Sequence, residues 1–90
     1  MKELNIIISD PIGLHARPAS FVANEASKYK SDILLTHNKT GRIGNLKSIM
    51  NILTLGIKKG DHVTIKFVGE DEAEACEGVH KSLVANNIID

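Results

Sequence analysis

Residues 62–68, HVTIKFV, alternate strictly between apolar and polar side chains. Successive side chains of a β-strand point to opposite faces, so this period of two predicts a strand that buries Val63, Ile65 and Phe67 on one side. Such a strand needs neighbouring strands and a second layer over its apolar face. The chain must therefore supply both, and this requirement restricts the possible folds more than any other feature.

Helical patterns predict what covers the sheet. After Pro18, small apolar residues recur at i, i+3, i+4 and i+7, the spacing that lines one helix face. A short helix is predicted from Ser48 to Gly56, and another from Asp71 to Asn86. Weaker strand patterns occur over residues 4–9, 32–38 and 42–45. The predicted buried helix positions are Ala19, Val22, Ala23 and Ala26 in the first helix, and Cys76, Val79 and Leu83 in the last.

The predicted element order is β-α-β-β-α-β-α. Short strands, a hairpin and interspersed helices favour an α+β domain in which the helices pack on one face of a mostly antiparallel sheet. A length of 90 residues suits one hydrophobic core, so residues 1–90 are expected to form a single domain.

Composition excludes several classes of function. The chain has 11 basic and 11 acidic residues, so a general nucleic-acid or membrane-surface binder is disfavoured. Only three aromatic residues are present, too few for a base-stacking platform. The single cysteine, Cys76, is expected to be a small buried hydrophobe. No signal peptide or membrane span is recognisable, and we expect a soluble cytoplasmic protein, monomeric by default.

The segment 10–20, DPIGLHARPAS, places a histidine where a helix begins. If His15 is the N-cap, the backbone N–H groups of Ala16 and Arg17 have no helical acceptor and can bind an anion. The positive helix end and the Arg17 cation disfavour a protonated imidazole, and a neutral ring keeps a nucleophilic lone pair. The sequence thus favours a phosphoryl acceptor, although a plain helix-start histidine with a local hydrogen bond remains an alternative.

Other chemistries lack their motifs. The remaining histidines, His37, His62 and His80, show no metal-ligand spacing, so neither a metal site nor a cofactor is expected. There is no nucleophile elbow and no glycine loop for nucleotide binding.

The start of the predicted helix at Ser48 could also hold a phosphate group. Ser48 is a good N-cap in its own right, and a phosphate there would meet a helix N-terminus and Lys47. The helix that follows is apolar nearly all round, and we expect Ile52 and Leu55 to be core and Ile49, Met50 and Leu53 to be exposed for a partner. The alternative is that all five are buried.

The segments GLHARPAS at 13–20 and NLKSIM at 45–50 resemble the HPr family, the histidine-containing phosphocarrier proteins of the bacterial phosphoenolpyruvate-dependent sugar phosphotransferase system. The resemblance covers essentially the whole chain. It implies an open-faced β-sandwich with four antiparallel strands and three helices on one side. It also implies a carrier rather than an enzyme, with His15 phosphorylated on Nδ1 and Arg17 assisting.

The resemblance also implies partners. Enzyme I would phosphorylate His15, which would pass the group to the IIA domain of a sugar permease. The LKSIM form resembles the low-GC Gram-positive branch, where HPr kinase/phosphorylase modifies the serine that matches Ser48 and a catabolite-control transcription factor binds the product. Docking is then expected at Ile49, Met50 and Leu53, with Phe21 or Ser20 from the first helix.

Three positions depart from the family pattern. Ile12 replaces a residue that is commonly small and polar, and Asn51 stands where many Gram-positive relatives have glycine. The hairpin at 36–44 is about two residues longer than usual. Two other functions remain open: a purely regulatory HPr-like protein acting through phosphorylated Ser48, which retention of His15 and Arg17 disfavours, and a small RNA-binding domain.

Overall fold

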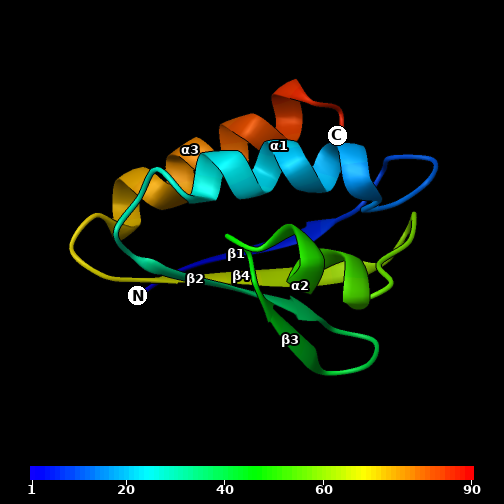
Figure 1. Cartoon of the computed structure of the whole chain (residues 1–90), viewed down its shortest axis with the longest axis horizontal. Coiled ribbons are helices and arrows are strands. Elements are labelled where there is room, and N and C mark those ends of the chain that lie inside the picture. Colours follow the sequence, from blue (N-terminus) through cyan, green and yellow to red (C-terminus); the bar gives the residue numbers. More distant parts are fainter.

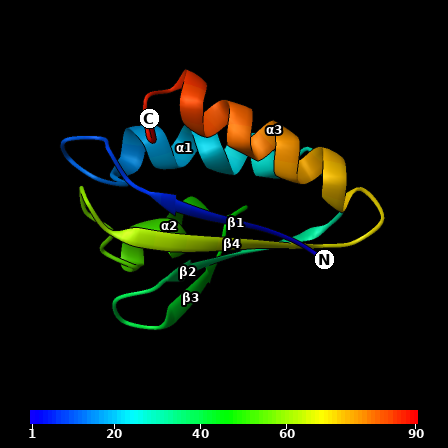
Figure 2. The same cartoon turned by 180° about the vertical axis from the view of Figure 1, so that it is seen from behind.

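The computed structural model describes all 90 residues and contains two layers (Figures 1 and 2). One antiparallel sheet has the strand order β1-β4-β2-β3, and three helices accompany it. The element order confirms the predicted α+β fold. The strands are β1 Lys2–Ile7, β2 Asp32–His37, β3 Arg42–Asn45 and β4 His62–Val68, and the helices are α1 Ala16–Ala26, α2 Ile49–Thr54 and α3 Glu72–Ala85.

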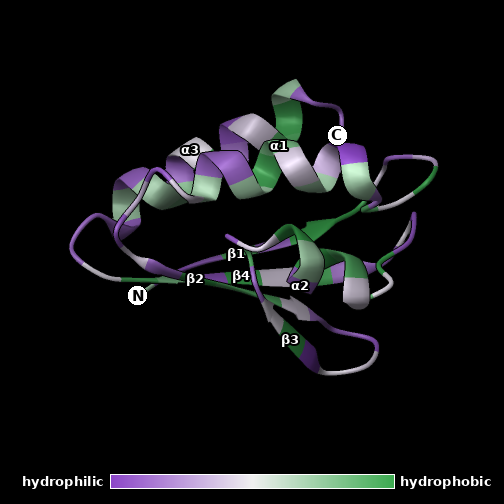
Figure 3. Cartoon of the chain, in the orientation of Figure 1, coloured by the Kyte–Doolittle hydropathy of each residue, from purple (hydrophilic) through white to green (hydrophobic).

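The alternating segment 62–68 forms β4, a central strand that pairs with β1 and β2. Its residues Val63, Ile65 and Phe67 are each no more than 1% exposed, as predicted. Ile65 stands opposite Leu4 of β1 and Leu35 of β2, so one row of apolar side chains crosses three strands. The opposite sheet face is open to solvent and carries exposed apolar residues such as Ile7, Leu34 and Ile43 as well as polar ones. Figure 3 colours the strands by hydropathy.

Helices α1 and α3 lie side by side over the sheet, and α2 packs beside α1 and against β3 (Figure 1). The small residues Ala19, Ala23 and Ala26 of α1 are fully buried, which lets this helix approach the layer below closely. None of the three helices is long and apolar enough to cross a lipid bilayer.

The predicted bounds of the first strand and the predicted burial of Cys76 need correction. The first strand spans 2–7 rather than 4–9, because after Ile7 the chain leaves β4 and Ser9 donates its backbone N–H to Ile88 near the C-terminus. The end of α2 is as predicted: the helix runs to Thr54 with Leu55 as its C-cap, and Gly56, at a φ of 64°, follows directly. Cys76 is half-buried at the margin of the core, while its neighbour Ala75 occupies the fully buried position.

A buried histidine at the end of β2 contacts the residue after α2 and the residue before β4. His37 is 4% exposed, its Nδ1 lies 3.1 Å from the Leu55 carbonyl oxygen, and its Nε2 lies 2.8 Å from Asp61 Oδ2. Hydrogen bonds from the Lys58 backbone N–H and from His37 hold the pKa of Asp61 below its ordinary value. The ring therefore links β2 to the end of α2 and to the turn before β4.

Replacing this histidine should destabilise the fold. His37→Phe keeps the ring volume and leaves the acceptors at Leu55 and Asp61 without their donor, which should cost about 2–4 kcal/mol of unfolding free energy. Denaturant unfolding measures the loss. The matched control is His62→Phe on an exposed residue, expected to change stability by less than about 0.5 kcal/mol. Equal effects of the two variants would contradict the assigned hydrogen bonds.

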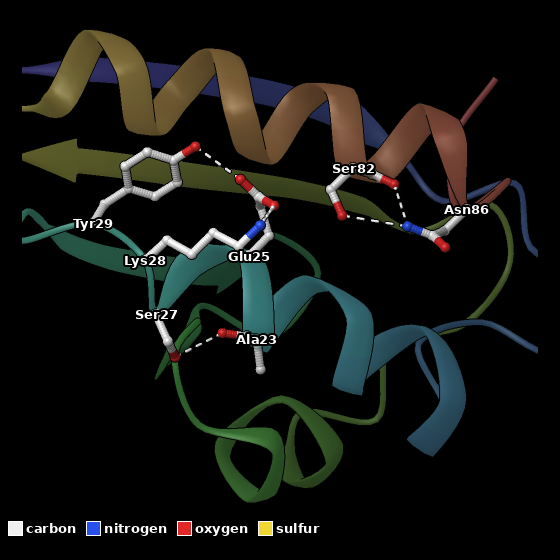
Figure 4. Close-up of polar contacts among 7 residues, drawn as sticks. All are labelled: Ala23, Glu25, Ser27, Lys28, Tyr29, Ser82 and Asn86. Carbon is white, nitrogen blue, oxygen red and sulfur yellow. Dashed lines mark hydrogen bonds and ion pairs between the residues drawn. The ribbon is translucent and has the colours of Figure 1, made fainter.

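The only tyrosine follows α1 in the chain and packs against the middle of α3. The Tyr29 hydroxyl donates to Glu25 Oε2 at 2.8 Å (Figure 4). This bond, with burial and the nearby acidic charge, raises the pKa of Tyr29 to about 12. In α3, a Cβ at Gly78 would collide with the Tyr29 hydroxyl, so glycine permits this close approach.

The raised pKa makes stability depend on alkaline pH. Because folding favours the neutral phenol, Tyr29 contributes its full stability below the ordinary value of 10.0 and loses that contribution as the pH rises towards about 12. The chain has one tyrosine and no tryptophan, so tyrosinate absorbance follows this residue alone. We expect a higher midpoint in the folded chain than in denaturant, and no alkaline stability loss of this kind in Tyr29→Phe. Coincident midpoints would disprove the assignment.

Candidate functional site

The loop between β1 and α1 is a closed turn. The Asp10 backbone carbonyl accepts from the Gly13 N–H at 2.9 Å, and Asp10 Oδ1 accepts from the Ile12 N–H at 2.9 Å. Gly13 has a φ of 83°, in the left-handed region that favours glycine. Next to it, the Leu14 N–H donates to the Ile57 carbonyl at 3.0 Å. The turn is thereby anchored to the segment that follows α2, and it presents His15 at the start of α1.

His15 is the N-cap of α1, as predicted. Its backbone is extended, with φ −85° and ψ −176°, and its side chain makes no capping hydrogen bond. The N–H groups of Ala16 and Arg17 donate to no acceptor in the chain. The imidazole is 33% exposed, so it is shielded on one side and open on the other. The first turn of α1 therefore offers unpaired donors beside an accessible ring.

A shallow groove surrounds the imidazole. The His15 and Arg17 side chains line it together with residues from the preceding turn and from the first turns of α1. Arg17 is exposed and makes no ion pair. Asn86 and Asn87, just after α3, form the far wall, a contribution that nothing in the local sequence around His15 indicates. The groove thus combines a titratable ring, a free guanidinium and unpaired backbone donors.

The sequence pattern does not predict that the Asp10 carboxylate lies beside the His15 ring. Asp10 Oδ1 lies 3.6 Å from His15 Nε2, and the Asp10 side chain is only 17% exposed. The sequence predicts only positive surroundings for the ring. In the structure a carboxylate faces one nitrogen and the helix end lies on another side, because the turn at 10–13 folds Asp10 back towards the ring.

Ser48 is the N-cap of α2, also as predicted. Its Oγ accepts from the Asn51 backbone N–H and from Asn51 Nδ2, each at 3.2 Å. The Asn51 Oδ1 in turn accepts from the Asn45 N–H at 3.1 Å. Lys47 does not face Ser48: its ammonium donates to the Tyr29 carbonyl at 2.7 Å. The expected pairing of a phosphate with Lys47 is therefore not prepared in this conformation, whereas Asn51 lies directly on the hydroxyl.

The expected docking residues divide into two groups. Met50 is 68% exposed, Phe21 41% and Ile49 37%, so the alternative that the α2 residues are all buried is wrong. Leu53 is half-buried against the core, and the Ser20 hydroxyl donates to the Arg17 carbonyl at 2.7 Å. Ile12, one of the departures from the family pattern, is 71% exposed beside the groove. We call Ile12, Phe21, Ile49 and Met50 the apolar surface.

Comparison with known proteins agrees with this geometry. A family model described as the HPr component phosphorylation site of the phosphotransferase system matches residues 2–85. Phosphocarrier protein HPr of Mycoplasma pneumoniae is 46% identical over 89 residues, covering 99% of this chain and all of the relative. A solved histidine-containing phosphocarrier protein from a mycoplasma superposes with a TM-score of 0.94 at 40% identity, covering 99% of both chains. The Bacillus subtilis catabolite repression protein Crh superposes with a TM-score of 0.70 at 34% identity, covering both chains fully.

Fold and site together define a small α+β carrier-type protein that presents one histidine at the start of a surface helix. The family model covers nearly the whole chain, and the identity to curated relatives extends over the full length. The chain belongs to the HPr family, the phosphocarrier proteins of the phosphotransferase system.

Proposed function

We propose that this chain accepts a phosphoryl group on Nδ1 of His15 from phosphorylated enzyme I and passes it to the IIA domain of sugar permeases. One observation supports this most directly: the accessible His15 ring lies at the N-cap of α1 with no capping hydrogen bond, next to the unpaired N–H groups of Ala16 and Arg17. Membership of the HPr family supports the same role. The protein then carries the group without converting a substrate of its own.

The site chemistry suits reversible transfer. A phosphoryl group on Nδ1 adds negative charge at a helix start, where backbone donors and the helix dipole favour anions. The Arg17 guanidinium supplies a planar pair of donors that fits phosphate oxygens. Each helix-end interaction of this kind contributes about 0.3–1 kcal/mol at an exposed site. Stabilisation of this size holds the phosphoryl group without trapping it.

Partner docking is proposed at the apolar surface. Ile12 and Phe21 line the groove that contains His15, and Ile49 and Met50 are exposed on α2, which packs beside α1. Exposed apolar residues near a reactive group are typical of protein interfaces. A donor protein that covers these residues would also exclude water from the transferred phosphoryl group.

The experiment that tests the carrier function is intact-mass analysis after incubation with phosphoenolpyruvate, Mg²⁺ and enzyme I from the same organism. We expect one added phosphoryl group, lost on mild acid treatment and mapped to the peptide that contains His15. Omission of enzyme I is the control. Absence of labelling by a matched enzyme I would contradict the proposal and favour the purely regulatory function, with Ser48 as its phosphorylation site.

Ser48 is proposed as a regulatory phosphorylation site that HPr kinase/phosphorylase modifies, and a catabolite-control transcription factor is proposed to bind the phosphorylated form. The supporting observation is its position: the half-buried hydroxyl stands directly before the exposed Ile49 and Met50. A phosphate there would place two negative charges at the edge of the apolar surface. Docking of enzyme I would then require the desolvation of those charges.

A charge at this position should slow phosphoryl transfer. Ser48→Asp keeps a good N-cap and adds one negative charge beside the apolar surface, so we expect phosphorylation by enzyme I to slow roughly tenfold through weaker docking. Rates of labelling at several protein concentrations measure this effect. Asn38→Asp adds the same charge in the hairpin after β2 and should leave the rate unchanged. Identical rates for both variants would contradict the regulatory role.

A further inference from the structure

We infer that Asp10 is a positioning residue for His15, and that its carboxylate keeps the imidazole proton on Nε2 so that the Nδ1 lone pair is free to accept the phosphoryl group. The inference deepens the proposed function and rests on it. Its basis is the 3.6 Å approach of Asp10 Oδ1 to His15 Nε2. No role for Asp10 follows from the sequence motif around His15.

The Asp10 carboxylate is held in place independently of His15. The same Oδ1 accepts from the Ile12 N–H at 2.9 Å, and the backbone carbonyl of Asp10 accepts from the Gly13 N–H at 2.9 Å. The backbone bond closes the turn at 10–13, and the side chain cannot swing away without losing its bond to the Ile12 N–H. The carboxylate is also 83% shielded, since only 17% of it is exposed, and this strengthens its electrostatic effect on a close neighbour.

The charge distribution around the ring selects a tautomer. A carboxylate accepts hydrogen bonds and donates none, so it favours the form in which Nε2 carries the proton. The other charged side chain that lines the groove is Arg17. Its guanidinium only donates hydrogen bonds, so it cannot accept one from an N–H of the ring. No protein group donates to Nδ1 or accepts from it. Contacts of this kind are often longer in a free protein than in its reacting complex.

This tautomer lets both transfers proceed without moving a proton. In the first, the Nδ1 lone pair forms a bond to phosphorus, and the bond from phosphorus to the phosphorylated donor protein breaks with its electron pair on the donor. The ring then carries phosphorus on Nδ1 and a proton on Nε2, and its positive charge lies beside Asp10. In the second, a nucleophile of the acceptor protein forms a bond to phosphorus while the N–P bond breaks. The electron pair of that bond returns to Nδ1, and the ring is neutral again in its original tautomer.

The test separates charge from structure. Asp10→Asn keeps an oxygen that can accept from the Ile12 N–H and removes the negative charge. Nitrogen NMR of the His15 ring, recorded well above the ordinary titration range of histidine, gives the ratio of the two neutral tautomers. We expect the ratio of Nε2–H to Nδ1–H to fall about two- to fivefold, the factor that an interaction at a partly exposed site produces. Asp32→Asn, a charge loss at the start of β2, should leave the ratio unchanged.

A second readout follows the phosphorylated product. With a fixed amount of phosphorylated enzyme I, the equilibrium fraction of phosphorylated chain should fall in Asp10→Asn by a similar factor, because the cationic product ring loses its carboxylate. An unchanged tautomer ratio in Asp10→Asn, with the Ile12 amide signal still in its folded position, would overturn the inference. The tautomer measurement needs no phosphoryl donor, so failure of wild-type labelling would refute the carrier function separately.

Discussion

Replacing His15 by alanine is expected to abolish phosphoenolpyruvate-dependent labelling and to leave the fold intact. The imidazole makes no capping hydrogen bond, and its backbone conformation is extended, which alanine adopts without strain. The unfolding free energy should therefore change by no more than about 1 kcal/mol. Because no other side chain in the groove has a nucleophilic nitrogen lone pair at neutral pH, no substitute acceptor is available there.

Two further variants make this experiment specific. Arg17→Ala retains the acceptor ring and should slow labelling by roughly 10- to 100-fold, since it removes one cationic partner of the transferred group. His80→Ala removes an exposed histidine of α3 and should label like the wild type. Intact mass and the initial rate of labelling are the measurements. A His15→Ala protein that still accepts one acid-labile phosphoryl group from enzyme I would refute the site assignment.

Gly13→Ala should damage both stability and transfer. The residue has a φ of 83°, and a Cβ there would lie 2.7 Å from the Lys58 Cα and closer still to the Ile57 carbonyl oxygen. That carbonyl accepts the Leu14 N–H, so relief of the collision must pull the His15 turn away from the segment after α2. We expect a loss of about 3 kcal/mol or more from strain and the broken anchor together.

The control for Gly13→Ala is a glycine with the same backbone and no close neighbour. Gly41 has a φ of 75°, and a Cβ there would meet nothing within 4 Å. Gly41→Ala should therefore cost only the conformational term, about 1–2 kcal/mol, with no change in labelling rate. Misplacing His15 by about an ångström should slow labelling of Gly13→Ala roughly 100-fold. Equal stability losses and unchanged labelling in both variants would show that the turn does not position His15.

The patterns that predicted the elements are local, and the structure confirms most of them. Period two in 62–68, the small-residue stripe from Ala19 to Ala26 and the N-caps at His15 and Ser48 all follow from neighbouring residues. The errors lie where distant segments intervene. The first strand ends early because Ser9 bonds to Ile88, and Lys47 is directed to the Tyr29 carbonyl rather than to Ser48.

The amino-acid sequence by itself determined the order of strands and helices, the position of the histidine at a helix start and the apolar residues beyond it, since periodicity and capping act within a few residues. Only the tertiary structure decided which polar groups meet. The turn at 10–13 brings Asp10 close to the His15 ring. His37 contacts Asp61, which is 24 positions away in the sequence. Asn86 and Asn87, near the C-terminus, line the groove. Such contacts depend on how the two layers pack and on the backbone angle at Gly13, and no local pattern encodes them.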